Sequence, residues 1–211
     1  MQEIDTSVLK QRSKEVLQSN RKLCFIGLGL IPFILNFLSN ITDFIPALKN
    51  SFTSILFVFI MSVILLTFTP GFARLALNLI NYKYASLDDI LHGFKVFGKT
   101  VAMGLFVGLV VTVGTLFFIV PGVIIGISLY YSFYILAEDT SKPISQCLSE
   151  SREMMNGYKL QFFLLELSFI GWYILEVLSF GIAALWVSPY TTLTEAQFYE
   201  ELKPVNLDIL N

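Results

Sequence analysis

The chain alternates between long apolar runs and short polar segments, and several runs are longer than the helices of most soluble domains. A helix needs about 20 mostly apolar residues to cross the roughly 30 Å hydrocarbon core of a bilayer. The pattern therefore predicts an all-α, polytopic transmembrane helix bundle of about six spans. The expected spans are residues 22–40, 54–82, 96–113, 115–138, 158–178 and 181–199.

These spans are expected to pair as three helical hairpins within one transmembrane domain, residues 22–199. The third hairpin depends on a turn at Ser179-Phe180-Gly181, because the chain is apolar almost throughout residues 160–189. One long helix across that region is the alternative, so five and six spans both remain open. A polar tail, residues 200–211, is expected to follow in the cytoplasm.

Three polar segments predict short amphipathic helices on the inner membrane surface. Residues 1–21 carry apolar side chains on one face and cations on the rest, and they are too polar for a signal peptide. Ser86–Lys95 opens with a Ser-x-x-Asp capping pattern. The third segment, residues 143–157, has apolar residues at helical spacing after a proline and ends at Asn-Gly.

The distribution of positive charge predicts the orientation of the bundle. Of the 14 lysines and arginines, only Lys49 lies in a predicted outer loop and only Arg74 lies inside a span. Cytoplasmic loops are enriched in lysine and arginine, so both termini are predicted in the cytoplasm. Cys147, in a predicted inner segment, would then react with an impermeant maleimide only after the membrane is opened.

The composition of the chain argues against several classes of function. The chain is 55% hydrophobic and only 14% charged, with a net charge of −2, which gives nucleic acid no basic face to bind. The two cysteines and the single histidine, His92, form no cluster with metal-ligand spacing. No span carries a nucleophile with its base. We therefore expect no metal, no cofactor and no enzymatic activity.

Prolines in the second helix of each hairpin predict helix breaks at Pro70-Gly71, Pro121-Gly122 and Pro189. The two C-terminal hairpins share the order glycine, proline, acidic pair, which indicates either an internal repeat or the general abundance of these residues in membrane helices. Breaks that meet around a cavity would resemble the ion and substrate sites of transporters. Breaks that pack against other side chains, with no cavity between them, would be structural kinks.

Three ionisable residues at membrane depth are the candidate site: Arg74, Glu166 and Glu176. Arg74 and Glu166 are expected at similar depths and could pair. The pair would fix helix packing or form a substrate or proton site, and Arg74 could instead extend its charge to the inner interface. Glu176 is expected near the outer end of its span, within reach of headgroups or water.

Several blocks resemble one protein family. They are Pro121-Gly122, Ile135–Asp139, Ser151–Lys159, Leu167–Trp172 and Pro189-Tyr190 through Phe198-Tyr199. The chain is similar over nearly its whole length to DUF975, a family of uncharacterised bacterial integral membrane proteins. The resemblance implies a location in the bacterial plasma membrane and brings no established activity.

The function predicted from the residues is that of a multipass scaffold, regulator or other interaction protein. Membrane lipid and other membrane proteins are its expected partners. The alternative is a transporter or channel for a small solute or lipid, which would need a polar cavity joining Arg74, Glu166 and the proline breaks. The sequence predicts no oligomeric state.

Overall fold

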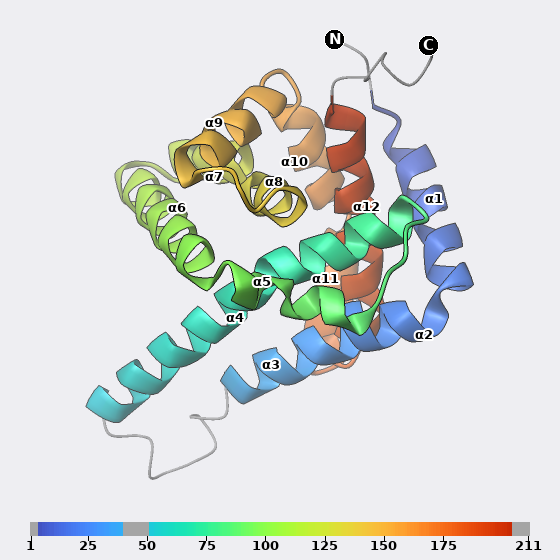
Figure 1. The fold of residues 1–211 in the computed structure, drawn as a ribbon, viewed down its shortest axis with the longest axis horizontal. Helices are drawn as coiled ribbons and strands as arrows, with labels where there is room; N and C mark the ends of the chain where they lie inside the picture. Colours follow the sequence, from blue (N-terminus) through green and yellow to red (C-terminus); the bar gives the residue numbers. More distant parts are fainter. Residues whose placement is uncertain (1–3, 40–50, 204–211) are drawn as a thin grey trace.

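Figure 1 shows the computed structural model of the chain, which describes residues 4–39 and 51–203. All regular elements in these residues are helical, so the predicted all-α class is confirmed. The helices are α1 (Thr6–Ser19), α2 (Arg21–Leu23), the π-helix η1 (Cys24–Leu30), α3 (Ile31–Ser39), α4 (Ser51–Ile80), the 3-10 helix η4 (Leu87–Leu91), α5 (His92–Lys95), α6 (Phe97–Phe117), α7 (Ile119–Leu129), α8 (Ser132–Glu138), α9 (Ile144–Met154), α10 (Lys159–Leu167), α11 (Ile170–Leu178) and α12 (Ala184–Leu202).

Five helical stretches of the described chain are long and apolar enough to cross a membrane. They are Arg21–Ser39, Phe52–Ile80, Phe97–Phe117, Ile119–Glu138 and Lys159–Leu178. The sixth predicted span, 181–199, falls on α12, which is not among the five because it carries Glu195, Glu200 and Glu201. The number of spans and their pairing as hairpins remain predictions.

α12 packs against the earliest elements of the chain, α1 and η1, and against α4. Its start lies directly on η1, where a Cβ added to Gly29 would come within 2.5 Å of the carbonyl oxygen of Leu185. Only glycine permits this approach of two backbones. The Ser188 hydroxyl then donates to the Leu28 carbonyl at 2.9 Å. Further along α12, Leu193 and Phe198 are fully buried.

α4 continues through Pro70, so the predicted break there is not an interruption of the helix. Its first half exposes large apolar side chains such as Phe52 and Phe59, whereas Leu75 and Ala76 in its second half are fully buried. At the proline the backbone of η4 approaches closely, since a Cβ on Gly71 would lie 2.0 Å from the Ile90 carbonyl oxygen. A neighbouring segment thus supports the helix where proline removes a hydrogen bond.

The interruption predicted at Pro121 lies three residues earlier, at Phe118. The backbone of Phe118 is extended and separates α6 from α7, which pack side by side. Pro121 therefore falls in the first turn of α7, where its missing N–H has no intrahelical partner to lose. The two helices touch closely, because a Cβ on Gly122 would lie 2.1 Å from Thr115 Oγ1.

Pro189 lies inside α12, which also continues without interruption. The three prolines have three different neighbours: Pro70 lies at η4 and α5, Pro121 opposite the end of α6, and Pro189 against η1. They are spread along the bundle instead of meeting around one cavity.

Two predicted polar helices are capped at their starts, and the cap at Ser86 is the one that the sequence predicted. The Ser86 hydroxyl accepts the N–H of Asp88 at 3.2 Å, and the Asp89 carboxylate accepts the N–H of Ser86 at 3.0 Å, which starts η4. At α1 the Asp5 carboxylate accepts the N–H of Ser7 at 2.9 Å. α9 occupies most of the third predicted polar helix. Their position on a membrane surface remains a prediction.

Candidate binding site

Arg74 is held near the buried end of α4 by partners from three other elements. Its guanidinium lies 3.4 Å from Oδ1 of Asp89 in η4 and donates to the carbonyl of Ala137 in α8 at 3.3 Å. It also lies 3.2 Å from Nε2 of His92 in α5. Because a guanidinium can only donate, a hydrogen bond here requires the neutral imidazole with Nε2 as the acceptor.

The electrostatics of this cluster favour a fixed cation. Ala137 belongs to the last turn of α8, whose carbonyls lack intrahelical partners and carry the negative end of the helix dipole. Burial lowers the pKa of His92, and the nearby charges of Arg74 and Lys95 lower it further. Arg74 thus joins α4, the η4–α5 segment and α8 at one point.

The structure does not bring Arg74 and Glu166 together. Glu166, in α10, accepts the hydroxyl of Tyr173 at 3.3 Å, while its other oxygen is buried with no hydrogen-bond partner among the described residues. Glu176, in α11, lines a separate cavity with Phe33 and Phe180. The three predicted site residues therefore occupy three different places.

A fourth ionisable residue, Glu195 in α12, is the most buried carboxylate of the described chain, at 9% exposure. Its Oε2 accepts the hydroxyl of Tyr130 at 2.7 Å, and its backbone carbonyl accepts the hydroxyl of Tyr131 at 3.0 Å. Sequence reasoning missed Glu195, although it lies inside the sixth predicted span. The rule that marked Glu166 and Glu176, an acid at membrane depth, would also have marked Glu195.

Aromatic side chains surround this carboxylate. The ring of Tyr131 lies 5.3 Å from that of Tyr134, 5.5 Å from that of Phe162 and 5.1 Å from that of Tyr199, measured between centroids. Tyr131 and Phe162 are fully buried. Tyr131 and Tyr134 therefore pack inside the bundle.

A cavity of about 360 Å³ opens beside Glu195. Its walls come from α4, α6, α7, α8 and α12, and its lining residues are Thr69, Phe72, Ala73, Val107, Gly126, Leu129, Tyr130, Phe133, Tyr134, Thr192 and Glu195. Most of these side chains are apolar or aromatic, and Glu195 is the one acid among them. The volume is within the range of small-molecule sites, roughly 300–1,000 Å³.

The side chains of this site do not resemble a metal centre. No group of three or more histidine, cysteine, aspartate or glutamate side chains comes together within residues 4–39 and 51–203. Both cysteines, Cys24 and Cys147, are buried and free.

A family model matches the part of the chain that holds Glu195 and the tyrosines near it. Residues 109–206 match the model of DUF975, a protein of unknown function. The resemblance seen in the sequence motifs is thus confirmed from the second half of α6 to the end of α12. No curated protein and no solved structure matches the chain.

The DUF975 segment contains Glu195, Glu166, Glu176 and the tyrosines around them. Arg74 and the whole of α4 lie outside it. The carboxylate, Tyr130, Tyr134 and Phe133 of the cavity therefore come from the DUF975 segment, while α4 supplies the opposite wall through Thr69 and Phe72.

Proposed function

We propose that this chain is a multipass interaction or regulatory protein of the bacterial plasma membrane that binds a small organic cation at Glu195. The observation that carries the proposal is a buried carboxylate at the wall of an aromatic-lined cavity. A quaternary ammonium ion or a protonated amine is the ligand class that this arrangement fits. No catalytic step is part of the proposal.

The chemistry of the cavity supports a cation over an anion or a neutral solute. A carboxylate attracts a cation strongly where apolar walls keep water away. The rings of Tyr130, Phe133 and Tyr134 can add attraction through their negatively charged faces, as in other sites for alkylammonium groups. The hydroxyl of Tyr130 already donates to Glu195, which fixes the direction of the carboxylate.

The proposal favours a regulatory binding protein over a transporter. The polar path expected for transport would join Arg74, Glu166 and the proline sites, yet Arg74 is paired with Asp89 and the three prolines pack against different neighbours. A transporter for the same cation is the second candidate, and it is favoured by the cavity itself. The two candidates differ in whether bound ligand crosses the membrane.

The binding site is tested with choline and its uncharged isostere 3,3-dimethylbutan-1-ol on the purified full chain. Choline is expected to raise the midpoint of thermal unfolding, because a ligand that binds only the folded state stabilises it. The isostere is expected to have no effect. Glu195→Gln keeps the shape of the side chain and should weaken choline binding about tenfold.

Glu176→Gln is the matched control, since it removes a carboxylate from a different cavity. It should leave choline binding unchanged. Equal stabilisation by choline and by the isostere, or equal losses in both variants, would refute the cation site. Uptake of labelled choline into proteoliposomes that depends on Glu195 would favour the transporter instead.

A further inference from the structure

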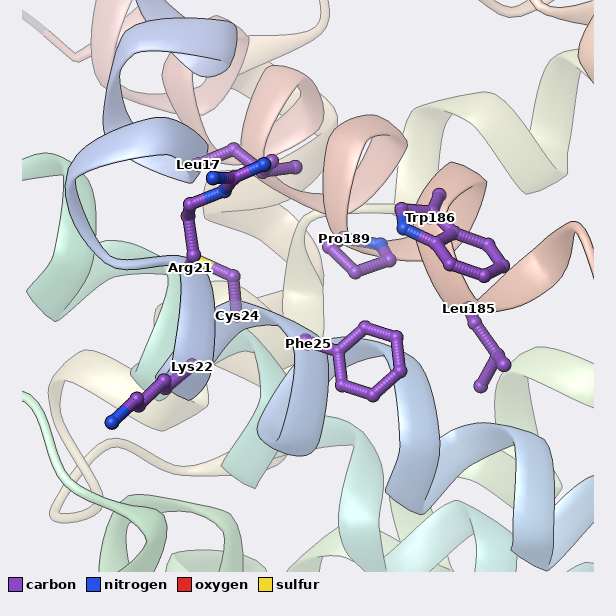
Figure 2. A pocket seen from close by; sticks show the side chains of 8 residues that line it. All are labelled: Leu17, Arg21, Lys22, Cys24, Phe25, Leu185, Trp186 and Pro189. Atoms are coloured by element: carbon purple, nitrogen blue, oxygen red, sulfur yellow. The ribbon is translucent and has the colours of Figure 1, made fainter.

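A second cavity, of about 310 Å³, lies between the start of the first candidate span and α12. Figure 2 shows its lining residues: Leu17, Arg21, Lys22, Cys24, Phe25, Leu185, Trp186 and Pro189. The rings of Phe25 and Trp186 lie with Pro189 and Leu185 on one side. The Arg21 guanidinium lies beside Leu17 on the other side, and Lys22 extends away from the cavity on its own side of α2.

The cavity follows from the way α12 meets η1. The two backbones touch at Gly29 and Leu185, and the Ser188 hydroxyl closes the contact on Leu28. Toward Arg21 the chain turns from η1 through α2 into α1, and Asn20 leaves the helical conformation between α2 and α1. Leu17 and Arg21 lie on one side of the cavity and Leu185 and Trp186 of α12 on the other, so an apolar groove lies next to a basic rim.

The charge of this groove is entirely positive. Its lining includes Arg21 and Lys22 and no acid, and neither cation has a carboxylate within salt-bridge distance in the part of the chain that the structure describes. Lys14 of α1 lies 5.8 Å from the ring centroid of Tyr190, so the neighbouring stretch of α1 adds a further cation near α12.

The position of the groove along the chain matches the boundary between hydrocarbon and headgroups. Arg21 is the first residue of the first candidate span, and the polar helix α1 precedes it. Lysine and arginine at such a boundary attract anionic lipid. Trp186 packs on Phe25, one turn further into the span, with 5.8 Å between the ring centroids.

We propose that this groove binds an anionic phospholipid of the adjacent leaflet. The phosphate lies at Arg21, and one acyl chain runs along Phe25, Leu185 and Trp186. The absence of an acid from the lining argues against a zwitterionic lipid, whose ammonium group would have no counterpart. This site is separate from the Glu195 cavity and does not depend on its ligand.

The test uses the purified full chain in detergent, titrated with phosphatidylglycerol or with phosphatidylcholine of the same acyl chains. Native mass spectrometry counts the bound lipid, and thermal unfolding reports stabilisation. Phosphatidylglycerol is expected to bind and to raise the unfolding midpoint more than phosphatidylcholine does. Arg21→Gln should weaken phosphatidylglycerol binding about fivefold, which corresponds to the loss of one cation near the membrane surface.

Arg152→Gln is the matched control, because Arg152 is an exposed cation of α9 that does not line the groove. It should leave phosphatidylglycerol binding unchanged. Equal binding of the two lipids, or an equal loss in both variants, would overturn the proposal, since general surface charge would then explain the attraction. Stabilisation by inorganic phosphate equal to that by phosphatidylglycerol would overturn it too, because the acyl chain would have no part.

Discussion

Arg74 contacts side-chain and backbone groups from three other segments of the chain. Helix rise places Arg74 and Glu166 at similar depths, and the sequence therefore offers them as a pair. Similar depth alone does not bring two side chains into contact, however. In the structure the carboxylate that pairs with Arg74 is that of Asp89 in η4. The missing information was that the η4–α5 segment folds back along α4.

Double-mutant cycles test this assignment. Arg74→Leu should lower the free energy of unfolding by about 1–2 kcal/mol, since the pair is intermediate between an exposed and a buried ion pair. Combination with Asp89→Leu should show a coupling energy of about 1 kcal/mol, whereas combination with Glu166→Leu should be additive. Unfolding in detergent, followed by circular dichroism, is measured for the wild type, the three single variants and the two double variants.

A cycle that couples Arg74 to Glu166 and leaves Asp89 additive would contradict the structure. The Asp89 variant also loses the cap of η4, which lowers its own stability. That loss is present in both arms of the cycle and cancels in the coupling energy.

At the scale of elements, the position of a proline does not by itself decide whether a helix is interrupted; the neighbouring segments matter as well. Pro121 falls in a first helical turn, and α4 and α12 run through Pro70 and Pro189. The sequence shows that proline removes a hydrogen bond, but not whether a neighbour supports the helix there. At Pro70 that support comes from the backbone of η4, which Gly71 allows to approach.

The close approach at Gly71 can be tested with one methyl group. Gly71→Ala should destabilise the protein by about 1–3 kcal/mol, because the added Cβ would overlap the Ile90 carbonyl oxygen. Gly98→Ala is the control, since its Cβ meets nothing within 4 Å. It should be neutral or slightly stabilising, because alanine favours helix more than glycine does. Thermal unfolding of the two variants separates these outcomes, and similar midpoints would disprove the close contact.

Local patterns in the sequence predicted the helical elements well and their mutual contacts poorly. The apolar runs and the Ser86 cap depend on nearby residues, and the structure has helices and a capping box at those places. The site around Glu195 depends on Tyr130, which is 65 positions away in the chain. Such a contact is fixed by packing of whole helices, which no local pattern contains.

At the scale of the whole molecule, burial divides the bundle into two parts. Large apolar side chains are exposed along the first half of α4 and at the α6–α7 and α11–α12 turns, for example Phe59, Leu116 and Phe180. The buried side chains of the core come from the second half of α4, from α8 and from α12, for example Leu75, Leu136 and Phe198. Lipid would cover the first part, whereas the side of the membrane that the buried part faces stays a prediction.

A labelling test of the predicted orientation needs a thiol other than Cys147. Cys147 is fully buried and burial raises the pKa of its thiol, so it should resist an impermeant maleimide even in opened membranes. Ser145→Cys, on a chain with Cys24 and Cys147 replaced by alanine, places an exposed thiol on the same helix. It should be labelled only after the membrane is opened, as a gel shift would show, and labelling in intact cells would reverse the orientation.

The late position of α12 in the chain has a consequence for biosynthesis. α12 joins segments made much earlier: Glu201 pairs with Arg12 at 3.0 Å, and Lys203 pairs with Glu138 at 2.5 Å. Before α12 is synthesised, Tyr131 lacks its hydrogen-bond acceptor in Glu195. The groove at Arg21 also lacks the wall formed by Leu185 and Trp186. The nascent protein thus reaches the packing described here only after α12 has left the ribosome, and a stop codon before Ala184 would leave a product for proteases to remove.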